Sequence, residues 1–166
     1  MYVALKDADA FFANLPVELR SASVRGLHSA ALRLQGVITT VLIPSRTPQP
    51  VDRGVYRAGW RTVFESDGAT VENLEVHAIF IEEGVRAENV KPGKKMISAL
   101  VEWVVRKGIA GGKEAVSVAW AIARAQQKKG IFANGQGLGI VRELVDVWVE
   151  RVTQEEVLRE VGEVFE

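Results

Sequence analysis

The 166-residue sequence contains no cysteine, and its charges show no excess of either sign. Without cysteine there are no disulfides, thiolate metal sites or cysteine nucleophiles, which favours assembly in a reducing environment. Lys and Arg together number 21, as do Asp and Glu. No global field therefore draws the molecule to nucleic acid or to a membrane, so an electrostatic partner must be met by a local group of charges.

Long apolar runs are also missing. The longest, such as "GVITTVLIP", are too short to span a bilayer. The first residues, "MYVALKDADAFF", carry acids where a signal peptide would be basic. We therefore predict neither export nor a membrane partner.

Residue patterns typical of catalysis or metal binding are lacking as well. The two histidines, His28 and His77, lie far apart without further ligands nearby. Glu82 and Glu83 are adjacent in an expected strand and would point to opposite faces, which makes them a poor acid/base pair. No serine lies in a nucleophile elbow, and "GQGLG" lacks the Walker lysine and serine. We predict a protein that is not an enzyme and holds no metal or cofactor.

The residues that are present predict an α+β fold. Apolar positions at three- and four-residue intervals from Asp9 to about Leu42 predict a long N-terminal helix, with Asn14 as candidate N-cap and Pro16 in a first turn. A proline-bearing loop follows, and then "WRTVFES" and "ATVENLEVHAIFI" read as antiparallel strands joined by a turn at Asp67 and Gly68.

Helices are predicted in the second half. "MISALVEWVVRKG" and "GKEAVSVAWAIARAQQKKG" each end in a glycine C-cap signal, and the second is apolar nearly all round, which predicts burial on more than one side. An amphipathic helix from Val141 to Val152 follows, and Thr153 and Glu156 form a capping box that would begin another helix. The prediction is a small antiparallel sheet flanked by helices over residues 1–137, with a C-terminal helical extension over residues 138–166.

A group of arginines lies within and beside the segment "VDRGVYRAGW". It comprises Arg46, Arg53, Arg57 and Arg61, opposed only by Asp52, and a second basic group comprises Lys91, Lys94 and Lys95. Both groups are compatible with solvated loops, with acidic groups of a neighbouring subunit such as its glutamate-rich C-terminal helix, or with a phosphate backbone. These residues alone leave all three possibilities open.

The order of these segments resembles the tail-component family of long-tailed bacteriophages, small neck or tail-completion proteins. That family typically reads Pro-Val-Asp-Thr-Gly, then Leu-Arg and Ser-Trp, before the first strand, matched here by Pro50, Val51, Asp52, Gly54, Arg57 and Trp60. Its second segment is matched by Asn73, Ala78, Glu82, Gly84 and Arg86, and its closing alanine-rich helix by Ala119 to Ala125, Gly130 and Phe132. The chain departs from the family pattern at Arg53, His77, Glu83 and Val85.

The resemblance implies a structural protein of the virion, assembled in the host cytoplasm, that joins head and tail. It implies a homo-oligomeric ring, a hexamer on family grounds, which contacts the connector, tail terminator or tail tube proteins and through which DNA can pass. Bidentate bridges would then form between subunits or docking layers through Asp52, Arg53, Arg57, Arg61, Glu82 and Arg86. Gly54 and Gly84 would allow the turns into and out of the sheet. The alternative is a nucleic-acid-binding module whose basic loops contact genome DNA.

Overall fold

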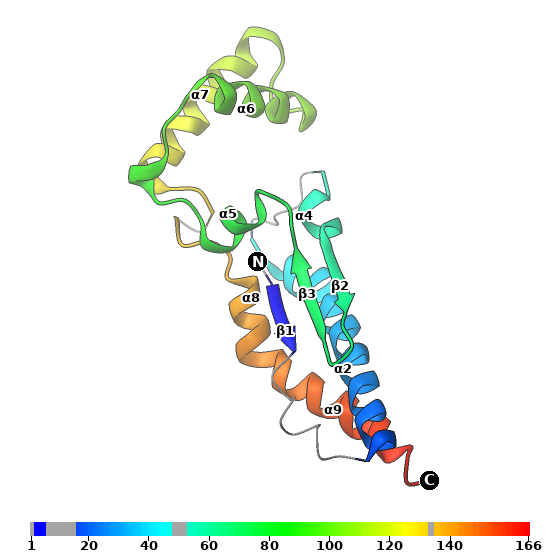
Figure 1. The fold of residues 1–166 in the computed structure, drawn as a ribbon. Helices are drawn as coiled ribbons and strands as arrows, with labels where there is room; N and C mark the ends of the chain where they lie inside the picture. Colours follow the sequence, from blue (N-terminus) through cyan, green and yellow to red (C-terminus); the bar gives the residue numbers. More distant parts are fainter. Residues whose placement is uncertain (1, 6–15, 48–52, 133–134) are drawn as a thin grey trace. The chain divides into compact units, whose positions relative to one another are not determined.

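The computed structural model describes residues 2–5, 16–47, 53–132 and 135–166, and the predicted α+β class is confirmed (Figure 1). A three-stranded antiparallel sheet has the strand order β1-β3-β2. The elements are β1 (Tyr2–Leu5), α2 (Val17–Val37), η1 (Ile38–Leu42), α3 (Ile43–Ser45), α4 (Val55–Ala58), β2 (Trp60–Phe64), β3 (Ala69–Asn73), α5 (Ala78–Glu83), η2 (Ala87–Asn89), α6 (Lys94–Arg106), α7 (Gly112–Lys129), α8 (Ile140–Glu143), η4 (Leu144–Val149) and α9 (Glu150–Gly162).

The chain forms two compact units. Unit 1 combines Met1–Ile79 with Gly139–Glu166, and unit 2 is Phe80–Leu138. The expected division placed residues 138–166 in an extension of their own, whereas in the structure Gly139–Glu166 belongs to unit 1. Unit 2 is thus an insertion between two segments of unit 1.

The sheet of unit 1 contains the predicted hairpin and one strand that was not predicted. β2 and β3 pair from Trp60 opposite Asn73 to Phe64 opposite Ala69, and the Glu65 N–H donates to the Gly68 carbonyl across the turn at 2.9 Å. β1 pairs with the other edge of β3, which makes β3 the central strand. Four residues are too few for a period-two pattern to be recognised, which is why β1 escaped prediction.

The second predicted strand was too long. It was expected to run to Ile81, but β3 ends at Asn73 and the residues from Ala78 onward form α5. The Asn73 side chain accepts a hydrogen bond from the Glu75 N–H at 3.0 Å, and the Ala78 N–H donates to the Glu75 carbonyl. This local turn ends the strand despite the β-branched residues that follow, because an Asn side chain can substitute for ladder bonds.

The long N-terminal helix is confirmed from Val17, and it continues through η1 and α3 to Ser45. Pro16 is its N-cap, and the Pro16 carbonyl accepts the Arg20 N–H at 3.0 Å; Asn14, the predicted cap, lies outside the described residues. The π-helical turn of η1 precedes Pro44, whose ring and missing N–H disturb the α-helical ladder.

Among the described residues, the Val17–Ser45 helix is the one whose length and composition would allow it to cross a membrane. Half of its most apolar window is buried in the structure. The buried face, from Ala22 to Leu42, packs on the sheet and on α9. Packing in the core of unit 1 therefore accounts for its apolar composition.

The C-terminal helix is continuous, with a π-helical segment η4 between α8 and α9. Thr153 lies inside α9 and does not cap a new helix, so the predicted capping box was wrong. Val152 and Glu156 are the buried residues of α9, whereas Leu158, in the same helix, and Phe165, after it, are 70% and 75% exposed. The widened turn changes which residues face α2, and a pattern with a 3.6-residue period does not anticipate that change.

Unit 2 is built on the α6–α7 pair. Both predicted glycine C-caps are confirmed, since Gly108 and Gly130 have φ of 66° and 82°. Ile97 packs against Ala119 and Ala123, with Leu100 and Val101 beside them. The prediction of burial on more than one side was wrong for α7: it buries one alanine stripe, and Trp120 is 42% exposed.

Candidate interaction surfaces

The basic turn predicted around Gly54 is a single helical turn. Gly54 has φ of 76°, and its carbonyl accepts the Ala58 N–H at 2.8 Å. Only a residue without a Cβ enters this left-handed conformation at little cost, so Gly54 provides the turn that the sequence led us to expect. Asp52, predicted as an interface residue of this turn, lies outside the described residues.

The turn is fixed to the sheet by buried groups. Asn73 is 1% exposed, and its Nδ2 donates to the Tyr56 carbonyl at 2.8 Å. The rings of Tyr56 and Trp60 meet edge to face, with centroids 6.0 Å apart, and both are buried. A Cβ on Gly59 would lie 2.7 Å from the Asn73 Oδ1, so the chain passes this amide closely. α4 is therefore a rigid support for whatever it presents to solvent.

The four arginines of the basic group differ in what they contact. Arg61 is paired across the sheet with Glu72, with Nη2–Oε1 at 2.6 Å, and Arg46 contacts Glu143, with Nη2–Oε2 at 2.6 Å. Arg53 is exposed. Arg57 is exposed too, and it contacts no carboxylate among the described residues. Of the predicted arginines, Arg57 is thus the one held on the turn with its charge open to a partner.

The predicted site residues of unit 2 lie near the end of α5. Glu82 is 5% exposed, which leaves little of its carboxylate for another subunit, whereas Arg86 is exposed and unpaired within the described residues. Gly84 has φ of 73°, and a Cβ there would overlap the backbone of Gly137. The Val85 N–H donates to the Ile131 carbonyl at 3.1 Å. Gly84 therefore provides the expected turn and also a close approach of two chain segments.

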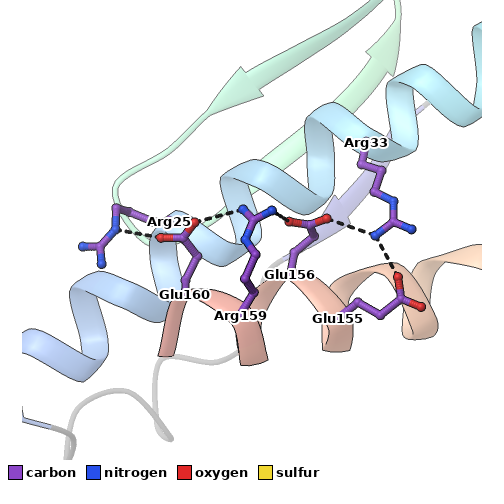
Figure 2. Close-up of polar contacts among 6 residues, drawn as sticks. All are labelled: Arg25, Arg33, Glu155, Glu156, Arg159 and Glu160. Atoms are coloured by element: carbon purple, nitrogen blue, oxygen red, sulfur yellow. Dashed lines mark hydrogen bonds and ion pairs between the residues drawn. The ribbon is translucent and has the colours of Figure 1, made fainter. Parts of the chain in front are cut away.

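An ion-pair ladder that the sequence did not predict joins α2 to α9 (Figure 2). Arg25 contacts Glu160 at 3.0 Å, Glu160 contacts Arg159 at 3.0 Å, and Arg159 contacts Glu156 at 2.9 Å. Glu156 then contacts Arg33 at 3.0 Å, and Arg33 contacts Glu155 at 2.7 Å. The partners from α2 and α9 are more than 120 positions apart, so no local spacing reveals them.

The ladder shifts the ionisation of its members. Hydrogen bonds from Arg159 and then Arg25 lower the pKa of Glu160 below its usual value. Hydrogen bonds to Glu156 and then Glu155 raise the pKa of Arg33, and the hydrogen bond to Glu160 raises that of Arg159. Glu160 thus remains charged at neutral pH, and the carboxylates of the ladder are occupied by arginines of the same chain. Glu163 and Glu166 lie beyond the ladder and are exposed, and Glu163 also attracts Arg159.

Charge is divided unequally between the two units. Unit 2 has ten Lys and Arg against five Asp and Glu, and unit 1 has eleven against sixteen. The balanced chain therefore consists of a unit of net charge +5 and a unit of net charge −5. Overall composition concealed this separation.

The predicted lysine group lies on unit 2. Lys91, Lys94 and Lys95 are exposed and contact no carboxylate in the described part of the chain. Lys94 and Lys95 begin α6, where the helix dipole disfavours cations. Interaction with the helix dipole therefore does not account for lysines at this position.

The histidines are not close together, and the described residues contain no group of three His, Cys, Asp or Glu suited to a metal ion. His28 Nε2 lies 3.0 Å from the carbonyls of both Glu65 and Gly68, so this nitrogen carries the proton and donates to the hairpin turn. His77 is 3.9 Å from Glu75 at the surface. His28 thus joins α2 to the sheet.

No protein-family model, curated protein or solved structure matches the chain.

Proposed function

We propose that this protein is a structural component of a phage neck that assembles into a ring, joins the head connector to the tail and performs no catalysis. The sequence resemblance is the basis of this proposal. One structural observation carries it further: Gly54, Trp60 and Asn73, three positions that match the family motifs, converge on one corner of unit 1 and hold Arg57 outward. A rigidly presented, unpaired arginine suits a charge-assisted contact with a carboxylate of the next copy or layer.

The test compares two arginines of the same turn region. Arg57→Glu should leave the monomer folded and weaken assembly, because it places a carboxylate where a carboxylate partner is expected. Arg61→Ala is the matched control, since Arg61 already has Glu72 as its partner. Sedimentation velocity and electron microscopy of purified protein would report ring formation. A wild-type protein that stays monomeric at high concentration, or assembly unchanged by Arg57→Glu, contradicts the proposal.

The +5 charge of unit 2 favours a second candidate, a module that contacts genome DNA through the lysines of α6. Its signature is binding to a short duplex with an affinity that falls steeply with salt, whatever the protein's oligomeric state. Assembly without DNA, together with duplex binding no stronger than that of Lys94→Glu, would favour the ring.

A further inference from the structure

We propose that the groove between α6 and α7 binds the Leu158–Glu166 segment of a second copy. This inference rests on the proposed self-assembly and specifies the contact that would build the ring. Both surfaces contain exposed apolar side chains, and the groove has a lysine where the segment has glutamates.

The groove lies wholly in unit 2. It has a volume of about 510 Å³, and it is lined by Pro92, Gly93, Lys94, Ile97, Ser98 and Trp120. Trp120 is 42% exposed, although a side chain of this type is usually covered. Cavities of this size hold several apolar side chains. Lys94 is part of the lining, and Lys91 and Lys95 are its neighbours in sequence.

The proposed occupant is the end of α9 and the residues after it. Leu158 is 70% exposed and Phe165 is 75% exposed, so neither contributes to the core of unit 1. Glu163 and Glu166 flank Phe165 and form no ion pair within the described residues. The segment thus offers large apolar side chains beside carboxylates, which matches an apolar groove beside lysines.

Charge favours a second copy over DNA as the occupant. A phosphate backbone is bound by basic side chains, whereas Pro92, Ile97 and Trp120 offer apolar contact that phosphates do not use. The surplus of five positive charges on unit 2 equals the surplus of negative charges on unit 1. Contact between unlike units of successive copies would bring together units of opposite net charge.

Such a contact is heterologous, because different surfaces of the two copies meet. A heterologous contact repeats from copy to copy and closes into a ring when the rotation permits. Aromatic residues in a desolvated pocket, such as Phe165 against Trp120, are the side chains that carry most binding energy at interfaces.

The experiment uses Phe165→Asp and Trp120→Asp in the full chain, with Val76→Asp as a control at an exposed apolar residue that belongs to neither the groove nor the Leu158–Glu166 segment. Sedimentation velocity over a range of concentrations measures assembly, and circular dichroism checks the fold. Each test variant should weaken assembly at least tenfold, and the control should behave as wild type. Mixing the two variants should restore pairs but not rings, since each retains one intact surface.

A charge exchange provides a second, independent readout. Lys94→Glu should weaken assembly, and adding Glu166→Lys in the same chain should restore it at least partly. If wild type forms rings and both aspartate variants assemble equally well, the groove contact is overturned while the proposed function stands. If wild type does not assemble, the proposed function fails and this contact with it. Two further results also overturn the inference. One is a sedimentation coefficient of the wild type that does not change with protein concentration. The other is a Lys94→Glu variant that assembles normally but no longer binds a 30-base-pair DNA duplex.

Discussion

The side-chain amide of Asn73 donates a hydrogen bond of 2.8 Å to the backbone carbonyl of Tyr56. This bond ties the last residue of β3 to the single turn of α4, and the Asn73 Oδ1 at the same time accepts the Glu75 N–H. One buried residue therefore ends the strand, fixes the arginine-bearing turn and starts the reversal toward α5.

Replacing this amide should loosen the corner. We expect Asn73→Ala to lower the free energy of unfolding by about 1–3 kcal/mol, because it leaves the Tyr56 carbonyl without its donor. Asn89→Ala, at an exposed asparagine, should have an effect within about 0.5 kcal/mol. Urea denaturation measures the free energy of unfolding of both variants and of the wild type. An equal, small effect of the two substitutions would show that the Asn73 bonds are not needed for stability.

Two glycines of α2 should respond in opposite directions. A Cβ on Gly26 would lie 2.6 Å from the Val157 Cα, so Gly26→Ala must separate α2 and α9 and should cost about 1–3 kcal/mol. Gly36 has no atom within 4 Å of the corresponding position, and Gly36→Ala should stabilise by up to about 1 kcal/mol. Thermal unfolding of both variants tests this, and equal shifts of the midpoint would contradict the close helix contact.

The ladder predicts an acid-sensitive contribution to stability. Because the pKa of Glu160 is lowered in the folded state, this carboxylate stabilises the protein fully above its unfolded pKa, and the contribution is lost as pH falls through its folded pKa. Glu160→Gln should therefore be less stable than wild type at neutral pH, and this difference should shrink as pH falls below about 4.5.

The measurement is urea unfolding at a series of pH values from neutral to acid. Glu88→Gln, at an exposed residue outside the ladder, is the control and should keep the wild-type pH profile. A constant difference between Glu160→Gln and wild type at every pH would show that the ladder does not contribute through its charge.

A second pair of glycines lies where the chain passes from unit 2 to unit 1. Gly137 and Gly139 both have positive φ, of 75° and 58°. A Cβ on Gly137 would overlap the Glu82 carbonyl, whereas one on Gly139 would meet nothing within 4 Å. Gly139→Ala should cost about 1–2 kcal/mol from backbone strain alone, and Gly137→Ala should cost more. Thermal unfolding followed by circular dichroism compares them, and equal costs would argue against the close approach at Gly137.

Local signals explain which predictions succeeded. Gly108 and Gly130 mark the ends of α6 and α7 because a left-handed residue is needed there, and Asp67 and Gly68 lie at the hairpin turn. Each of these features depends on a few neighbouring residues. The sequence was therefore sufficient to predict the fold class and most elements.

Features that depend on distant residues were missed. The partners of Arg25 and Arg33 lie in α9, and the pairing of Arg61 with Glu72 removes from the basic group a charge that appeared available in the sequence. The buried face of α9 depends on a π-helical segment, and β3 stops early because of one asparagine side chain. Tertiary contacts decide such features, so the candidate site could be located only in part.

The insertion of unit 2 has a consequence for biosynthesis. Leu138 N–H donates to the Ile81 carbonyl at 2.9 Å, so the beginning and end of unit 2 meet and this unit is made from one continuous segment, synthesised before the second segment of unit 1. α2 emerges early but must wait for α9, whose Glu160 is 135 positions after Arg25. During that delay the side of α2 that meets α9, which includes Gly26, remains uncovered, and exposed apolar surface of this kind promotes aggregation during folding.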